Sequence, residues 1–442
     1  YHCAQAGLLV KAAHYYRAAA AQSIERAAFT ETRMQLQRGL AFAATLSDGP
    51  ERDELEAEML LALATVLQTT ASMSDAEAGQ LFRRAINASR GVARPQLLAR
   101  ALWGQFTNVL VRGEVVAARS LAEQLLVVAK AGNDVHTQIA AHTAMGIALF
   151  YQGCFVNARQ YLEIQQSILE TQSGVADLDW RTVTAGPAFL ALTLACLGYP
   201  NQAIVELNQA VGLGARKGSF ALAYSLSVAV RVLIVLRDLE QLRERTLELV
   251  ALSEKGGFHQ FLNQGMCALG WLEIQSGAIQ QGSVRLRAAL SEMSDLATLV
   301  GLPFYRSLLA DAQSVAEDQQ DNSAPLDEAL EISSRTDDTW FNAELHRRRG
   351  EVLAGAPSYS ALAETDLYRA LAIAREQAAK LFELRAATSL GRLWLIQGKR
   401  SDAYDLLFPI YSWFTEGFGT LNLEDAKELL DNLAQIAKPQ LR

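Results

Sequence analysis

The stretch from Gly212 to Ser219 comes nearest in this sequence to a phosphate-binding loop. Its letters are GLGARKGS, with three glycines and one lysine. A P-loop needs two glycines five residues apart, followed directly by Lys-Ser or Lys-Thr, and it follows a buried strand. Here Gly218 separates Lys217 from Ser219, and no strand-like segment precedes the glycines. We therefore expect a turn between two helices rather than a nucleotide site.

Histidines and cysteines offer no catalytic or metal-binding pattern either. His136 and His142 are six residues apart, which does not place them on one helical face. No HExxH, GxSxG or CxxC motif occurs. The cysteines are far apart, as is typical of reduced thiols in a cytosolic protein; they are Cys3, Cys154, Cys196 and Cys267. We expect no catalytic residue, no cofactor and no metal in this chain.

The densest run of charge is Arg347-Arg348-Arg349, with Glu344 and Glu351 on either side. Carboxylates three and four residues from an arginine lie beside it on a helix, so the sequence predicts a solvated face of ion pairs. The whole chain carries a net charge of −8 and contains no long basic block. A nucleic-acid partner is therefore not expected.

The composition favours helices throughout a chain of 442 residues. Half of the residues are hydrophobic, one fifth are charged and only nine are prolines. Residues 182–205 carry no charge, but Gly186-Pro187 and Gly198-Tyr199-Pro200 interrupt them. Because about 20 uninterrupted apolar residues are needed to cross a membrane, we expect a buried helix here and no membrane association. The chain begins with Tyr1 rather than methionine, so we expect a fragment of a longer protein.

Glycines seven residues apart recur along the chain. TAMGIALFYQG, CALGWLEIQSG and TSLGRLWLIQG each contain such a pair, and two further segments keep only the second glycine. The pairs are Gly146 with Gly153, Gly270 with Gly277, and Gly391 with Gly398; the single glycines are Gly113 and Gly198. Small residues follow the second glycine by five positions and apolar or small residues by nine. This pattern predicts a first helix, a tight turn capped by a left-handed glycine, and a second helix packed closely on the first.

The spacing of about 40 residues indicates an all-α solenoid of tetratricopeptide (TPR) type. HEAT-like repeats share the longer period, but the glycine offsets favour the TPR type. We predict a right-handed superhelix of about ten helix hairpins. Degenerate hairpins are expected over 1–94, the repeat array over 95–415 and a capping helix over 416–442.

First helices of such arrays line a concave groove. Counting from the mid-helix small residue, the groove positions include Gln264 and Trp271, Glu344 and Arg347, and Arg385 and Arg392. The groove is expected to be apolar near 140–150 and charged toward the C-terminus. Trp271 and Arg385 are the best candidates for ligand or peptide contact. The alternative is structural: Trp271 packs between hairpins, and Arg385 pairs with Glu344 or Glu383.

The segments ELHRRRGEVL and WFTEGF…DAKELL (Trp413 to Leu430) resemble the C-terminal region of a family of bacterial signalling proteins. Those proteins join an effector, often an adenylate or guanylate cyclase or a winged-helix regulator, to a STAND/AAA-type ATPase and a TPR arm. The resemblance spans nearly the whole chain and departs from it at 318–325 and at Arg237. It implies an ATP-binding parent, but no residue of that activity lies here.

Two functions follow as expectations. The first is a non-catalytic, cytoplasmic regulatory arm that binds a protein partner or the parent's own ATPase or effector domain. The alternative is a sensor domain that binds a sugar, another metabolite or a nucleotide in its groove.

Overall fold

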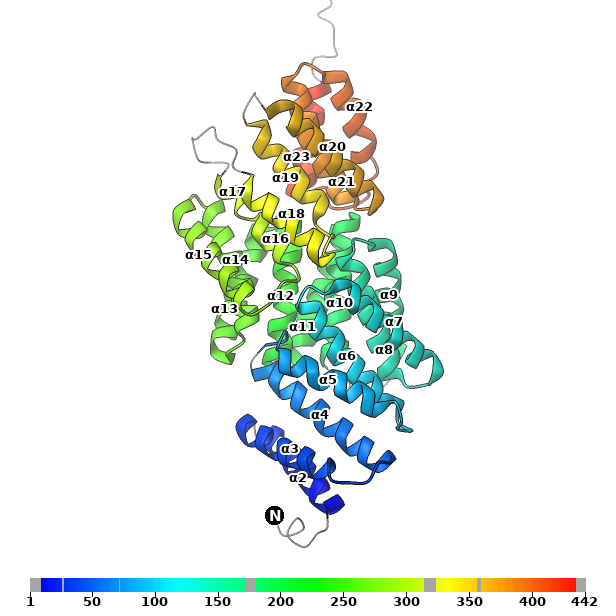
Figure 1. Ribbon diagram of the computed structural model, residues 1–442. Helices are drawn as coiled ribbons and strands as arrows, with labels where there is room; N and C mark the ends of the chain where they lie inside the picture. Colours follow the sequence, from blue (N-terminus) through cyan, green and yellow to red (C-terminus); the bar gives the residue numbers. More distant parts are fainter. Residues whose placement is uncertain are drawn as a thin grey trace, which may run out of the picture. The chain divides into compact units, whose positions relative to one another are not determined.

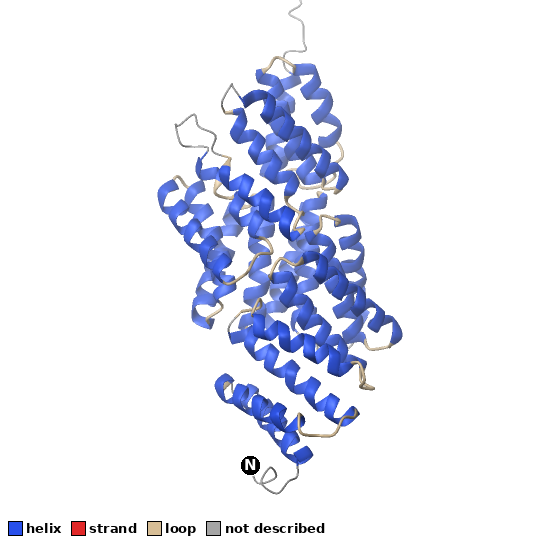
Figure 2. Cartoon of the chain, viewed as in Figure 1, coloured by secondary structure: helices blue, strands red, loops and turns tan. Residues whose placement is uncertain are grey.

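A computed structural model describes residues 9–25, 28–70, 72–171, 180–313, 323–355 and 359–434. Every regular element within these ranges is helical, and none is a strand (Figure 2). Consecutive helices pack against each other as antiparallel hairpins, for example α14 with α15 and α19 with α20 (Figure 1). The predicted all-α, TPR-like solenoid is confirmed.

The chain divides into two compact units. Unit 1 holds residues 1–148 together with 296–298, and unit 2 holds residues 149–295 and 299–442. The helices of unit 1 are α2 (Leu9–Glu25), α3 (Phe29–Ala43), α4 (Pro50–Thr70), α5 (Ala76–Ser89), α6 (Pro95–Val111), α7 (Val115–Ala131) and most of α8 (Val135–Tyr151). The unit boundary therefore falls inside α8. The division at 94 and 415 that the sequence suggested stays a prediction.

Unit 2 contains the repeats with the clearest sequence signature. Its first helices are α9 (Phe155–Thr171), α10 (Trp180–Leu197), α11 (Pro200–Lys217), α12 (Ser219–Leu236), α13 (Leu239–Gly256), α14 (His259–Gln275) and α15 (Ile279–Asp295). They are followed by α16 (Leu302–Ser307), α17 (Ala310–Gln313), α18 (Ala324–Thr336), α19 (Asn342–Ala354), α20 (Ser360–Glu376), α21 (Lys380–Ile396), α22 (Arg400–Tyr411) and α23 (Leu421–Ala434). α16 and α17 are short and separated by two residues, and residues 314–322 lie outside the described part.

Left-handed backbone conformations end the first helix of each glycine-marked hairpin. The five loop glycines have φ angles of 77°, 71°, 93°, 91° and 79°; they are Gly113, Gly153, Gly198, Gly277 and Gly398. Glycine adopts this conformation without steric cost, since it has no Cβ. Arg237 takes the same conformation between α12 and α13, with φ 61° and ψ 31°. The turn geometry of the repeat is therefore kept even where its usual residue is replaced.

The helices of the α14–α15 hairpin cross at a point where both carry glycine. A Cβ atom at Gly270 would lie 2.8 Å from the carbonyl oxygen of Gly282 and 3.1 Å from the backbone nitrogen of Leu286. Only glycine permits so close an approach of two backbones. Gly391 is less confined, because its nearest neighbours are side-chain atoms, Leu429 Cδ2 at 3.2 Å and Ala403 Cβ at 3.8 Å.

Within unit 2 the hairpin turns near its start contact the helices near its end. A Cβ at Gly153 would meet the side chain of Gln377, and one at Gly198 would lie 2.9 Å from Lys380 Cβ. The Glu416 carboxylate accepts a hydrogen bond from the Asn201 backbone at 2.9 Å. These contacts join segments about 200 residues apart.

Aromatic rings fill the interior beside these contacts. Phe150 lies 5.0 Å from Trp340, and Trp340 lies 4.9 Å from Phe341, measured between ring centroids. Phe341 in turn contacts Phe382 of α21 at 5.7 Å. Phe150 is fully buried. The positions near 140–150 that were expected to line an apolar groove, Ala140, Thr143, Ile147 and Phe150, are all buried instead. At the end of α8, Trp340 covers Phe150.

Within the described residues, one helix is long and apolar enough to pass for a membrane span, namely α12. Its 18-residue window is 78% buried within the protein, as for a core helix. The uncharged segment 182–205 forms most of α10 and the start of α11; residues 183–198 are buried, whereas Asn201, Gln202 and Val205 are exposed. Contrary to expectation, Gly186-Pro187 does not interrupt α10, which continues through Pro187 to Leu197.

Candidate functional site

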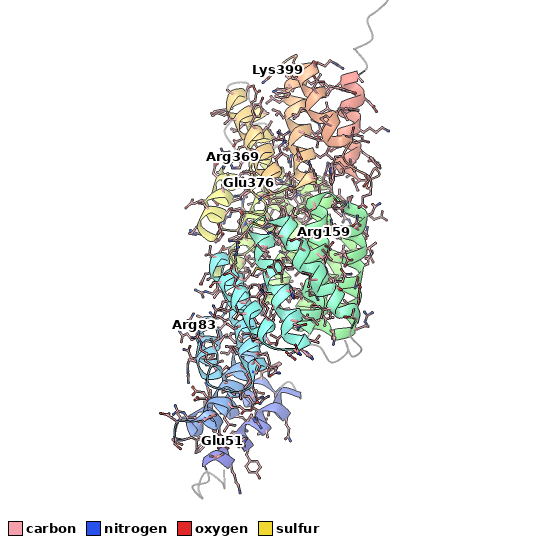
Figure 3. All side chains as sticks on the ribbon, turned by 90° about the vertical axis from the view of Figure 1, so that its right-hand side faces the viewer. Glu51, Arg83, Arg159, Arg369, Glu376 and Lys399 are labelled. Carbon is pink, nitrogen blue, oxygen red and sulfur yellow. The ribbon has the colours of Figure 1, made fainter. Side chains whose placement is uncertain are left out.

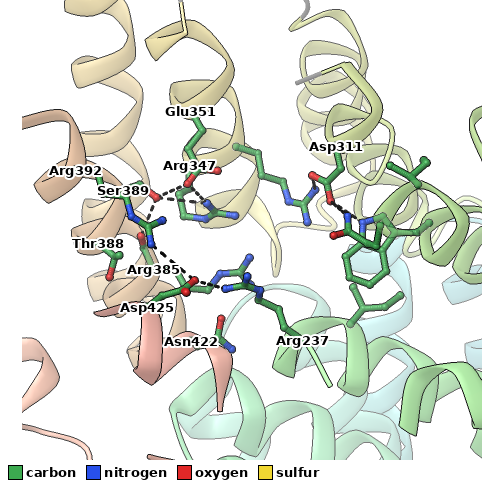
Figure 4. A pocket seen from close by; sticks show the side chains of 15 residues that line it. Arg237, Asp311, Arg347, Glu351, Arg385, Thr388, Ser389, Arg392, Asn422 and Asp425 are labelled. Atoms are coloured by element: carbon green, nitrogen blue, oxygen red, sulfur yellow. Dashed lines mark hydrogen bonds and ion pairs between the residues drawn. The ribbon is translucent and has the colours of Figure 1, made fainter. Parts of the chain in front are cut away.

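A polar cavity of about 430 Å³ lies in unit 2 on the faces of several first helices. The residues that line it come from the end of α12, from α14, α17, α19 and α21, and from α23 (Figure 4). They are Ile234, Arg237, Trp271, Ile274, Gln275, Asp311, Arg347, Arg348, Glu351, Arg385, Thr388, Ser389, Arg392, Asn422 and Asp425.

The helical period explains why these side chains share one cavity. Arg385, Thr388 and Arg392 are spaced by three and four residues, which places them on one face of α21. Arg347 and Glu351 have the same spacing on α19, as do Trp271 and Ile274 on α14. Residues of α14, α19 and α21 that the repeat pattern assigns to a groove therefore face this cavity.

A buried carboxylate lies beneath the arginines of the cavity. Glu344 has no exposed surface, and its oxygens accept hydrogen bonds from Arg347 at 2.8 and 3.1 Å. Arg385 forms an ion pair with the same carboxylate at 3.0 Å. Burial raises the pKa of Glu344, but the charges of Arg347 and Arg385 outweigh it and lower that pKa overall. Glu344 thus stays ionised and holds two guanidinium groups at the cavity floor.

Arg385 is buried close to three other arginines of the cavity, Arg347, Arg348 and Arg237. Burial, together with the guanidinium groups of these three arginines, outweighs the favourable charge of Glu344 and lowers the pKa of Arg385 to about 9. Its side chain is only 12% exposed. An additional negative charge in the cavity would therefore stabilise this group.

Trp271 lies between an apolar part of the cavity wall, which includes Ile274, and a charged part, which includes Asp311 and Arg348. Its indole Nε1–H donates to Asp311 Oδ2 at 2.6 Å, and the other oxygen of Asp311 accepts from Arg348 at 2.8 Å. Trp271 is 4% exposed, while Ile274 continues the apolar surface beside it. Trp271 therefore packs between hairpins and still presents an edge to the cavity.

The rim of the cavity carries the more exposed charges. Arg237 donates to Asp425 at 2.5 Å, and Arg392 approaches the same carboxylate at 3.9 Å, which is too long for a hydrogen bond (Figure 4). The side chain of Arg392 is half exposed. Glu351, recessed in the opposite wall, pairs with Arg347 at 2.5 Å and accepts a hydrogen bond from Ser389 at 2.6 Å. The side chain of Glu351 is 43% exposed, and the charge of Arg347 with the hydrogen bond from Ser389 lowers its pKa to about 2.

The structure brings together four of the six groove residues predicted from the sequence: Trp271, Arg347, Arg385 and Arg392. Glu344 lies under the cavity rather than in its wall, and Gln264 is buried in α14 without lining it. The predicted solvated face over 347–349 is wrong for Arg347 and Arg348, which are 6% and 7% exposed, because α17, α21 and α23 enclose this face of α19. Arg385 pairs with Glu344 and not with Glu383, which instead binds Arg375 and Lys380.

Sequence reasoning missed several lining residues. Arg348 and Asp311 lie outside the glycine-aligned positions, and Asn422 and Asp425 come from the capping helix. Arg237 could have been found from the sequence, because it is a charged residue at a turn position where five other hairpins have glycine.

Other candidates from the sequence form no comparable site. Gly218 connects α11 to α12 with φ 105°, so the glycine-rich stretch is a helix-to-helix turn. Cys154, Cys196 and Cys267 are free thiols, and Cys3 lies outside the described residues. Among the described residues, no three His, Cys, Asp or Glu side chains cluster as metal ligands would.

These features define an all-α, TPR-like helical-repeat protein with a polar cavity in its groove. No family model matches the sequence. An uncharacterized protein of Rhizobium meliloti strain 1021 is 23% identical over 422 residues, which cover 90% of this chain and 39% of that protein. The chain therefore spans about two fifths of that relative's length.

Solved structures share the repeat fold. A Rap protein complexed with competence and sporulation factor matches with a TM-score of 0.54 and 11% identity, over 89% of this chain and 99% of that one. A STAND protein with a TPR sensor from Pyrococcus horikoshii has a TM-score of 0.44 and 13% identity, over 84% of this chain and 54% of that one. At such identities the similarity to the Rap protein shows the fold alone.

Proposed function

We propose that this chain is the non-catalytic, regulatory repeat arm of a longer bacterial signalling protein and acts in the cytoplasm. The cavity carries the proposal, since polar side chains from six helical segments converge there. The resemblance to arms fused to a STAND-type ATPase and a cyclase or winged-helix effector supports this setting. So does the match to 39% of a longer relative.

In this proposal the groove binds a protein partner or another domain of the same parent. Cavity arginines such as Arg392 and Arg237 would contact acidic groups of that partner, because guanidinium groups bind carboxylates through two parallel hydrogen bonds. The matched variants Arg392→Gln and Arg369→Gln test it. Each removes one positive charge, but Arg369 is exposed on α20, outside the cavity (Figure 3).

The measurement is the nucleotide turnover of the full-length parent and the affinity of the isolated arm for the rest of that parent. Arg392→Gln should change both, and Arg369→Gln neither. A parent whose turnover is the same with the arm intact, altered or removed, and an arm with no affinity for the remainder, would contradict a regulatory role.

A second candidate function, small-molecule sensing, is favoured by the size and walls of the cavity. A volume of about 430 Å³ lies in the range of sites for small ligands, and Trp271 and Ile274 supply an apolar wall opposite the arginines. A thermal-shift screen of the purified chain against metabolites and nucleotides tests it. Stabilisation by several degrees with one compound would support sensing, and a flat response to all of them would count against it.

A further inference from the structure

The charges of the cavity wall do not balance. Five arginines and three carboxylates line it, so the wall has two surplus positive charges, in a protein whose net charge is −8. The buried Glu344 beneath reduces the surplus of the whole cluster to one. Burying like charges together is unfavourable, and an incoming anion would relieve it. The surplus of positive charge therefore indicates that a ligand of this cavity is negatively charged.

Arg237 provides the second observation. It holds a left-handed backbone conformation that disfavours every residue with a Cβ, at a turn where five hairpins have glycine. Its guanidinium reaches the cavity, where it pairs with Asp425. The described non-glycine residues with positive φ are Arg237, Ala297, Asp337 and Ala378. Of these, Arg237 is the one whose side chain lines the cavity.

Asp425 occupies the position that a ligand's acidic group would take. It lies between Arg237 and Arg392, hydrogen-bonded to the first and 3.9 Å from the second (Figure 4). The side chains of Arg237 and Arg392 are 36% and 50% exposed, so an anion can reach both of them from solvent. The Asp425 carboxylate therefore occupies the position between the two arginines that a free anion can take by displacing it.

We propose that the cavity binds the phosphate or carboxylate group of a small organic anion between Arg237, Arg392 and Arg385, in place of Asp425. The apolar edge formed by Trp271 and Ile274 receives the remainder of the molecule. This inference rests on the sensing function proposed above and adds its ligand class. Displacement of Asp425 also removes one of the two bonds that join α23 to the end of α12 and its turn, the other being the hydrogen bond from Asn422 to the Leu236 carbonyl oxygen.

Isothermal titration of the purified chain in low-salt buffer at pH 7.5 tests this with three probes: inorganic phosphate, succinate and the neutral compound glycerol. Saturable binding of phosphate, of succinate or of both is expected, with none for glycerol. Binding of phosphate alone identifies a phosphate ligand, and binding of succinate alone a carboxylate ligand. Affinity should fall as salt is added, because the attraction is electrostatic.

Variants locate the binding in the cavity. Arg392→Gln should weaken binding at least about tenfold, since a charge-assisted hydrogen bond is lost without disturbing a buried pair. Asp425→Asn should tighten binding severalfold, because it removes the internal competitor. Arg369→Gln, on the outer surface, should bind as the unaltered chain does.

Three outcomes would overturn the proposal: no saturable heat with phosphate or succinate up to millimolar concentration, equal binding by Arg392→Gln and the unaltered chain, or weaker binding by Asp425→Asn. A chain that ignores both anions but is stabilised by an uncharged metabolite would overturn the anion class and leave the sensing function standing.

Discussion

Arg237 and Asp425 form an ion pair at 2.5 Å that joins the turn after α12 to helix α23, 188 residues further along the chain. The pair is accompanied by a hydrogen bond from the Asn422 side chain to the Leu236 carbonyl oxygen at 3.2 Å. The capping helix thus contacts a hairpin turn in the middle of the sequence, and the cavity lies beside that contact.

Two substitutions of Arg237 separate the free-energy cost of its left-handed backbone from the stability that its ion pair with Asp425 contributes. Arg237→Gly and Arg237→Ala both lose the pair, but only glycine relieves the left-handed conformation, which costs about 1 kcal/mol with a Cβ present. The glycine variant should therefore be about 1 kcal/mol more stable than the alanine variant in urea unfolding. Equal stabilities would mean that this turn changes its conformation when the arginine is lost.

The backbone crossing at Gly270 should not tolerate a methyl group. In Gly270→Ala the new Cβ faces the carbonyl oxygen of Gly282, which a side-chain rotation cannot move, and overpacking of this kind costs about 1–3 kcal/mol. Gly391→Ala is the matched control, because its neighbours are side chains and alanine gains about 1 kcal/mol in helix propensity. Thermal unfolding should show a clear loss for the first and a change within about 1 kcal/mol for the second.

Glu344→Gln should strongly destabilise unit 2. It leaves the guanidinium groups of Arg347 and Arg385 without their shared buried charge, and losing one partner of a buried pair costs about 3 kcal/mol or more. Adding Arg385→Leu to Glu344→Gln removes one unpaired charge and should recover part of the loss. Chemical denaturation of both variants measures this; no recovery in the double variant would show that Arg385 does not depend on Glu344.

Asp338 should give the protein a pH-dependent stability. It is 1% exposed and accepts a hydrogen bond from the Gly301 backbone at 2.7 Å. Burial is the main reason that its pKa is raised to about 7; the charge of Asp337 also raises that pKa, and the Gly301 N–H and Arg231 lower it.

Because this folded-state pKa lies above the usual 3.8, the native protein binds the extra proton between these values. Stability should therefore fall as the pH rises from about 4 to about 7, by at most about 1.4 kcal/mol per pH unit. Asp338→Asn carries no titrating group and should flatten this part of the profile. Urea midpoints measured across that range test it, and parallel profiles for the two proteins would refute the assignment.

Local sequence patterns predicted the hairpins well because their physics is local. A glycine such as Gly277 ends a helix through its own backbone freedom, and the offset from Gly270 to Gly282 fixes which residues cross. The same offsets aligned Trp271, Arg347, Arg385 and Arg392 on one groove. They could not indicate that Arg347 is buried, since that depends on helices from other repeats.

The sequence by itself determined an all-helical repeat architecture and its glycine-capped turns, because helical period and glycine conformation act within a few residues. Only the tertiary structure decided which distant groups meet: Phe150 with Trp340, and Arg237 with Asp425. Those meetings depend on small rotations that add up over several hairpins, and no spacing of residues within one hairpin encodes that sum.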